Sequence, residues 1–99
     1  MTIEKRIYDG ALAREVLDNE AFTQAFADMK AEYAAALFAS PARDIEGREK
    51  LYLMVKLTEK LEATLTAAMT DGKMASQQRE YEAAALARDR ASGMQTMYQ

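Results

Sequence analysis

The chain has 99 residues, a net charge of -3 at pH 7, 49% hydrophobic residues and 29% charged residues. This length allows one domain, and the hydrophobic share is too high for a disordered chain. Cysteine and histidine are absent, which excludes disulfides, Cys/His zinc sites and nucleophiles activated by histidine. We therefore expect a protein that is not an enzyme and has no catalytic residues, metal or cofactor.

The apolar segments of the chain are short. The longest, AAALFA and LYLMV, fall far below the roughly 20 residues that cross a membrane. The N-terminal MTIEKRIYDG has acidic residues and no apolar core of a signal peptide. We therefore expect a soluble protein of the cytoplasm with no membrane partner.

One proline and four glycines leave few interruptions, so the composition predicts an all-α fold. Residues 1–8 are expected to form a loose arm, with Asp9 as the N-cap of a short helix over residues 10–18. Asn19 is expected to cap a longer helix that ends at residue 39. The apolar side chains of this helix fall within an arc of roughly 80°; they are Phe22, Phe26, Met29, Tyr33 and Leu37.

Ser40 and Pro41 predict a tight connector, after which Ser40 or Asp44 can cap a third helix over residues 42–71. Gly72 is expected to end this helix in the left-handed conformation. The two long helices then predict an antiparallel helical hairpin. Residues 74–91 predict an exposed fourth helix and residues 92–99 a frayed tail.

The third helix carries more apolar surface than one neighbouring helix covers. Its main face holds Leu51, Met54, Leu57, Leu61, Leu65, Ala68 and Met69, with Thr58 among them. This surplus predicts a homo-oligomer or docking on another protein. The expected interface residues are Phe38, Gly47, Leu53, Met54, Val55, Leu57 and Leu61. Gly47 either allows a helix to approach closely or precedes the start of the regular helix.

The charged residues at the start of the third helix have two interpretations. Arg43, Arg48 and Lys50 form an anion site if they gather at the helix N-terminus. Alternatively, they belong to a solvated first turn and a half with i,i+4 pairs between Asp44 and Arg48 and between Glu46 and Lys50. The acidic neighbours favour this second interpretation.

Three segments of the chain, Ala13 to Asn19, Pro41 to Leu57 and Asp71 to Ala75, together resemble a family of small uncharacterised helical proteins of tailed bacteriophages. The family pattern is roughly AREVL…PARDxEGREKLWLMLKLL…GKMA, and this chain has Tyr52 where the pattern tends to have tryptophan. The resemblance implies an accessory protein of phage morphogenesis or packaging, in the infected cytoplasm or the virion. It supplies no catalytic residues. The stretch EGREK is also similar to one helix of phage helical-hairpin proteins that sequester cyclic nucleotides.

Three functions follow as hypotheses. The first is a structural or assembly protein that binds itself and other phage proteins. The second is a small DNA-packaging subunit that contacts DNA through Arg79, Arg88 and Arg90 on the C-terminal helix. The third is an anti-defence protein that holds cyclic nucleotides between subunits, through Arg43, Arg48 or Lys50, or inhibits a host factor.

Overall fold

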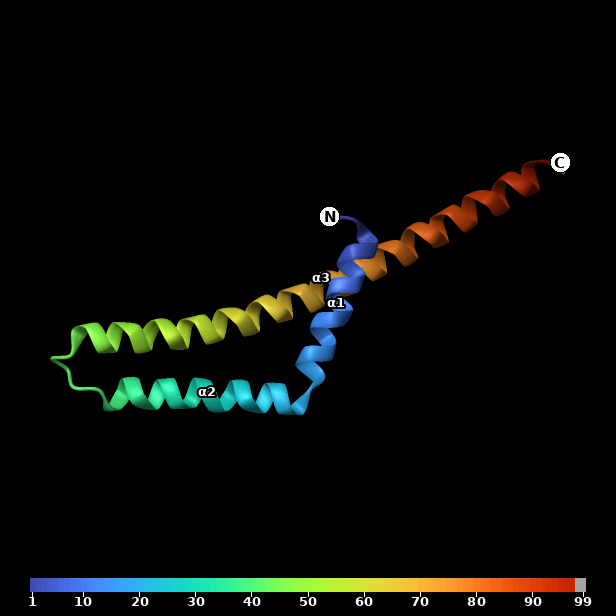
Figure 1. Ribbon diagram of the computed structural model, residues 1–99. Helices are drawn as coiled ribbons and strands as arrows, with labels where there is room; N and C mark the ends of the chain where they lie inside the picture. Colours follow the sequence, from blue (N-terminus) through green and yellow to red (C-terminus); the bar gives the residue numbers. More distant parts are fainter. Residues whose placement is uncertain (98–99) are drawn as a thin grey trace.

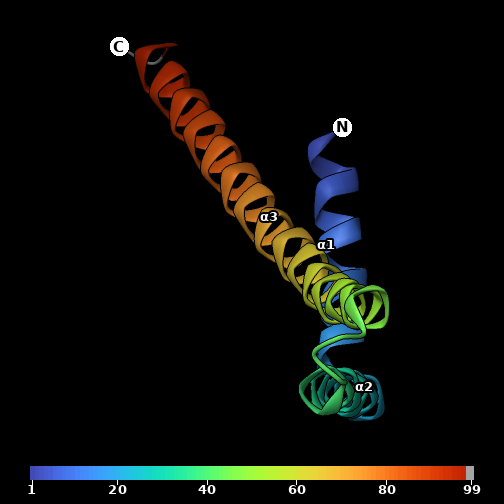
Figure 2. The same cartoon turned by 90° about the vertical axis from the view of Figure 1, so that its left-hand side faces the viewer.

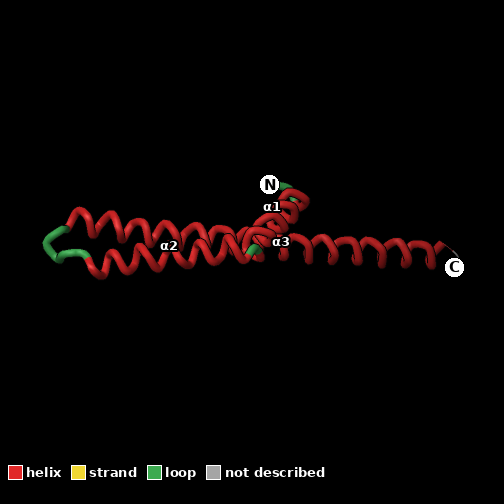
Figure 3. Tube along the Cα trace, turned by 60° about the horizontal axis from the view of Figure 1, so that its bottom comes forward, coloured by secondary structure: helices red, strands yellow, loops and turns green. Residues whose placement is uncertain are grey.

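The protein is all-α, as its composition predicts. The computed structural model describes residues 1–97, which form α1 (Ile3–Asp18), α2 (Glu20–Ala39) and α3 (Ile45–Met97). In Figure 1, α2 and the first half of α3 lie side by side and run in opposite directions. α1 crosses α3 near its middle, and the C-terminal part of α3 projects beyond both neighbours (Figures 1 and 3).

Each helix begins at a side chain that accepts a hydrogen bond from the backbone N–H three residues later. The acceptors are Thr2 for α1 at 3.1 Å, Asn19 for α2 at 3.0 Å and Asp44 for α3 at 3.1 Å. α2 ends where the Ser40 hydroxyl donates to the Leu37 carbonyl at 2.6 Å. The predicted caps Asn19 and Asp44 are confirmed; Asn19 starts α2, and Asp44, with Ser40, bounds the short connector between α2 and α3.

Several of the predicted helix boundaries are wrong. Residues 3–8 belong to α1 and not to a loose arm, and Asp9 lies inside this helix, where its carboxylate pairs with Lys5 at 3.1 Å. α3 continues through Gly72, which does not adopt a positive φ, so the expected third and fourth helices are one. Residues 92–97 of the expected tail are helical as well, and residues 98–99 lie outside the described part.

α3 turns a different face to α2 than its periodicity suggests. Leu51, Val55 and Thr58 are half-buried or buried, and Thr58, at 5% exposed, donates a hydrogen bond to the Met54 carbonyl at 2.8 Å. On the same side, Glu59 pairs with Lys30 of α2 at 3.7 Å. Val55 therefore packs toward α2 within the chain and is half-buried there; its expected place at an interface with a partner stays a prediction.

α1 meets α3 at two glycines, and this contact was not predicted from the sequence. A Cβ atom built on Gly10 would lie 2.7 Å from the Gly72 Cα and 2.9 Å from the Ala68 carbonyl oxygen. A Cβ atom on Gly72 would likewise lie 2.7 Å from the Gly10 Cα. Backbone therefore touches backbone, which only residues without a side chain permit. The two buried hydrophobic residues, Ala13 and Ala75, lie next to this crossing along their helices.

An ion pair joins the two helices beside the crossing. Arg6 of α1 donates to both carboxylate oxygens of Asp71, at 2.7 and 3.0 Å. This bidentate geometry is the strong form of an arginine–carboxylate contact. The hydrogen bond from Arg6 lowers the pKa of Asp71 below its ordinary value, although partial desolvation acts in the opposite direction.

We expect the stability of the α1–α3 contact to depend on pH through Asp71. Because the folded-state pKa is lowered, the contribution is complete above the unfolded aspartate pKa of about 4 and is lost as pH falls through the lower folded-state value. The measurement is the unfolding midpoint against pH for the wild type and Asp71→Asn, with exposed Asp89→Asn as the control. Asp71→Asn alone should flatten the acidic part of the curve; equal curves for all three proteins would contradict this assignment.

The molecule formed by the described helices is elongated. Its principal extents are 84 × 25 × 17 Å and its radius of gyration is 23.1 Å, whereas a compact domain of this length has a radius of about 13 Å. None of the helices within residues 1–97 is long and apolar enough to span a membrane.

Candidate interaction surface

The single chain has almost no core. Among the described residues, no large side chain is fully buried, and the buried hydrophobic residues are both alanines. The accessible surface is 8020 Å², against about 5,700 Å² expected for a compact monomer of 11.1 kDa. The excess, about 2,300 Å², indicates how much surface the chain offers to partners.

A continuous apolar part of this surface lies on the first half of α3. Leu53, Met54, Leu57 and Leu61 are between 45% and 64% exposed, and at 100° per residue they fall within an arc of about 100°. We call these four residues the leucine face. Each was expected at an interface with a partner. They lie on a side of α3 that α2 does not cover.

α1 covers the continuation of the leucine face along α3. The α3 residues that meet α1 are Ala68, Asp71, Gly72 and Ala75. By helical position they occupy the same arc as the leucine face. Figure 2 shows α1 passing alongside α3 before the chain turns into α2. On this side of α3, α1 thus covers the helix from about residue 68 to residue 75, and the residues before 68 are not covered.

Other exposed apolar residues lie away from the leucine face. Phe38, at 94% exposed, is near the end of α2, and Ile45 and Tyr52 are exposed on a different side of α3. Gly47 lies in the first turn of α3, and within the chain a Cβ atom there would meet only the Asp44 carboxylate. The interpretation that the regular helix starts after Gly47 is wrong, because α3 already begins at Ile45. The close approach of a second chain at Gly47 stays a prediction.

The residues of the expected anion site do not gather within one chain. Arg43 lies in the connector, and Arg48 and Lys50, two positions apart on α3, point about 160° away from each other. Lys50 pairs with Glu46 at 3.8 Å, as the solvated interpretation predicts. Asp44 caps α3 through Gly47.

The expected DNA contacts are spread along the projecting part of α3. Arg79 and Arg90 share a side but lie 11 residues apart, about 16 Å along the axis, and Arg88 faces roughly the opposite way. Glu80, Glu82 and Asp89 are interspersed among them. A single chain therefore presents no dense basic patch.

Because this arrangement concentrates little positive charge, we expect duplex DNA to stay unshifted in an electrophoretic mobility assay at low salt, where nonspecific binding is strongest. A shift that weakens steeply with added salt and is lost when Arg79, Arg88 and Arg90 are replaced by glutamine would contradict this expectation. A glutamine variant of Arg14, which pairs with Asp18 on α1 at 3.6 Å, is the control for a general loss of charge.

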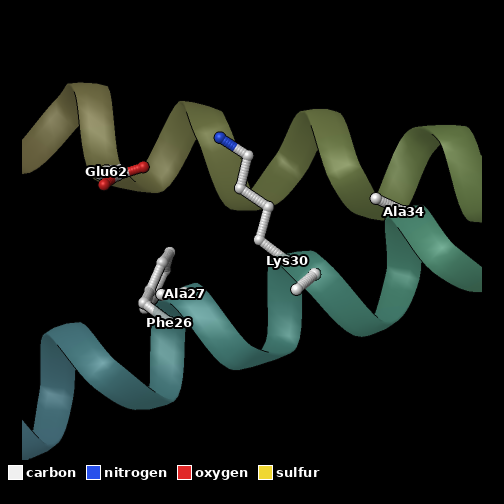
Figure 4. Close-up of a pocket in the computed structure, with 6 residues that line it drawn as sticks. Phe26, Ala27, Lys30, Ala34 and Glu62 are labelled. Atoms are coloured by element: carbon white, nitrogen blue, oxygen red, sulfur yellow. The ribbon is translucent and has the colours of Figure 1, made fainter.

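Two hollows lie between the helices, and neither gathers reactive groups. The smaller, about 360 Å³, separates α2 from α3 where the alanines of α2 leave space. Figure 4 shows Lys30 reaching from α2 toward α3 and Glu62 on the facing helix. The larger hollow, about 830 Å³, lies in the angle between α1 and α3. Residues 1–97 contain no cluster of three or more acidic, histidine or cysteine side chains able to hold a metal ion.

The spacing of small residues in the sequence indicates the contact between α1 and α3 at Gly10 and Gly72. The prediction instead followed the rule that a glycine ends a helix. Small residues recur on α1 at Gly10 and Ala13, and on α3 at Ala68, Gly72 and Ala75, in steps of three and four. Such spacing places them on one side of each helix, where it allows close helix approach. Comparisons with family models, curated proteins and solved structures found no match to this chain.

Proposed function

We propose that this chain is a non-enzymatic structural or assembly protein of a tailed bacteriophage, and that it acts through helix-mediated self-association and protein binding. The observation that carries the proposal is the absence of any fully buried large side chain within residues 1–93, whose burial the structure describes. A chain of this length that leaves five of its nine leucines exposed gains too little from burial to offset the entropy of ordering its backbone. Its helices are therefore completed by a partner.

The first partner is a second copy of the chain. The leucine face is apolar, continuous and bare, which is typical of an interface and not of a solvated surface. Ion pairs such as Lys5–Asp9 on α1 and Lys56–Glu59 on another side of α3 lie on solvated surface away from the leucine face. This division favours association through one defined side of α3.

The second partner is a phage protein, and the segments at Ala13–Asn19, Pro41–Leu57 and Asp71–Ala75 support this part of the proposal. These segments include the α3 cap, three of the four residues of the leucine face (Leu53, Met54 and Leu57) and the Gly72 crossing. The resemblance to phage proteins thus falls on the residues that build the interaction surface. The projecting part of α3 remains available to a partner when α1 and α2 are occupied.

Three measurements test the two parts of the proposal, self-association and binding to phage proteins. Light scattering across a concentration series should give a mass above that of one chain. Surface-immobilised protein should bind purified portal, terminase or other virion proteins, and mass spectrometry should find the chain in purified virions or in their assembly intermediates. A stable monomer without affinity for any of these proteins would refute the proposal.

Calorimetry with cyclic nucleotides separates this function from nucleotide sequestration. Because Arg43, Arg48 and Lys50 diverge within the chain, we expect no heat of binding. Saturable heat that Arg48→Gln removes would favour the sequestering function instead.

A further inference from the structure

The bare stretch of α3 has a definite length and a definite centre. α3 begins at Ile45, and α1 covers this side of the helix from Ala68, whose carbonyl oxygen lies against Gly10. The uncovered residues, 45–67, extend about 35 Å at 1.5 Å per residue. Their centre falls at about residue 56, next to Leu57.

The apolar and polar residues of this stretch are arranged about the same centre. The leucine face occupies the middle, from Leu53 to Leu61. The positions that continue it toward the connector are Glu46 and Lys50, and the position that continues it toward α1 is Thr64. An apolar middle with polar ends is the usual arrangement of a protein–protein interface.

We propose that the leucine face packs against the leucine face of a second copy, with the two α3 helices antiparallel about a two-fold axis near Leu57. This rests on the self-association in the proposed function and specifies its geometry. Leu53 of one copy then lies opposite Leu61 of the other. The N-terminal end of each α3 stops beside Ala68 of its partner, where α1 begins to cover the helix.

The position of α1 selects this direction over a parallel one. In a parallel, in-register pair, residues 68–75 of both copies would face each other across the interface. α1 already occupies this side of α3 in each copy, at backbone contact through Gly10 and Gly72, so the two α1 helices would collide. An antiparallel pair centred near Leu57 uses the bare stretch and leaves both crossings intact.

A stable pair requires only part of the excess surface of the chain, which also includes the projecting part of α3. If each copy buries half of its excess of about 2,300 Å², the pair buries about 2,300 Å² in total. This total lies in the range of about 2,000–5,000 Å² that is typical of obligate homodimers. A two-fold interface also closes on itself and leaves no bare leucine face to extend a filament.

Single cysteines test the geometry, because the natural chain has none. Leu57→Cys should form a disulfide-linked dimer on mild oxidation, since residue 57 meets itself near the axis. Leu53→Cys should not link to itself, because two copies of residue 53 are about 12 Å apart along the axis and disulfide Cβ atoms lie about 4 Å apart. Leu53→Cys mixed with Leu61→Cys should cross-link. Tyr52→Cys, on a different side of α3, is the matched control.

A second pair of variants avoids any effect on the apolar side chains. Lys50→Cys and Thr64→Cys replace exposed residues at the polar ends of the bare stretch, and they lie opposite each other in the antiparallel pair. Mixing these variants should give a heterodimeric disulfide, whereas each alone should give little. Circular dichroism on every variant checks that the helices are intact.

The possible failures are distinguishable. Self-linking of Leu53→Cys as fast as Leu57→Cys would overturn the antiparallel direction. A dimeric mass by light scattering, without cross-linking of either mixed pair, would place the interface elsewhere and leave the proposed self-association standing. A monomeric mass at every concentration would refute both the geometry and the self-association.

Discussion

Replacing Gly72 with alanine is expected to destabilise the protein, although the same substitution stabilises an isolated helix. In a solvated helix, alanine is favoured over glycine by about 1 kcal/mol. At Gly72, however, the new Cβ atom would lie 2.7 Å from the Gly10 Cα and 2.9 Å from the Arg6 carbonyl oxygen. Since both neighbours are backbone atoms, α1 must move away from α3. Forced insertion into packed sites costs about 1–3 kcal/mol.

The measurement is the free energy of unfolding by urea, followed by circular dichroism, at fixed protein concentration. Gly93→Ala is the matched control, because a Cβ atom there meets nothing within 4 Å. That variant should be equally stable or more stable than the wild type. Gly47→Ala should fall between the two, since only the Asp44 side chain must shift. A Gly72→Ala protein as stable as Gly93→Ala would show that the helices do not meet closely.

Moving the helices apart should also separate Arg6 from Asp71, which pair at 2.7 Å beside the crossing. Gly72→Ala is therefore expected to weaken the acid dependence of stability that Asp71 provides. Combining Gly72→Ala with Asp71→Asn should cost less than the sum of the two single changes, because the first already disturbs the ion pair.

Replacing Leu57 with aspartate is expected to have the largest effect on assembly. In the antiparallel pair the two copies of residue 57 are neighbours, so one substitution places two carboxylates together in the apolar middle of the interface. Removing a buried leucine costs about 1.5–3 kcal/mol per side chain. The dissociation constant of the dimer should rise by roughly 100-fold or more, since about 1.4 kcal/mol corresponds to a factor of ten.

Leu86→Asp is the control for this change. Leu86 is 52% exposed against 64% for Leu57, so the two leucines are comparable in exposure and lie on the same helix. Leu86 is on the projecting part of α3, outside the bare stretch. Sedimentation velocity should therefore give a dimer for Leu86→Asp and a monomer for Leu57→Asp at the same concentration. Equal behaviour of the two variants would contradict the assignment of the leucine face.

The local parts of this fold were predictable from the sequence. Asn19 and Asp44 cap their helices through the backbone N–H three residues later, and such bonds depend only on neighbouring residues. Phe22 and Phe26, predicted on one side of α2, have ring centroids 5.1 Å apart. The all-α class followed from composition for the same reason, because helix propensity is a property of short segments.

The contacts between distant segments were not predictable in the same way. Gly72 fits a helix C-cap by local rules, but its role is set by Gly10, 62 residues earlier, through the close approach of the two backbones. The side of α3 that faces α2 was missed for a related reason. Its apolar surface is wider than α2 can cover, so periodicity alone did not decide whether Val55 or Leu57 would face the neighbour.

The candidate surface was only partly predictable. Phe38, Leu53, Met54, Leu57 and Leu61 were expected to be available to a partner, and all five are exposed. Their exposure follows from a surplus of apolar residues, which can be counted in the sequence. The cover that α1 provides on the same side of α3 depends on tertiary structure, and it is this cover that fixes the centre of the bare stretch.

The central claim is that the chain completes its fold by pairing with another copy. Its most direct test is thermal unfolding at several protein concentrations, with sedimentation equilibrium at the same concentrations. A folded state held by association predicts a mass of at least two chains and an unfolding midpoint that rises with concentration, because association shifts the folding equilibrium by mass action. A single-chain mass with a midpoint that does not change with concentration would contradict the claim.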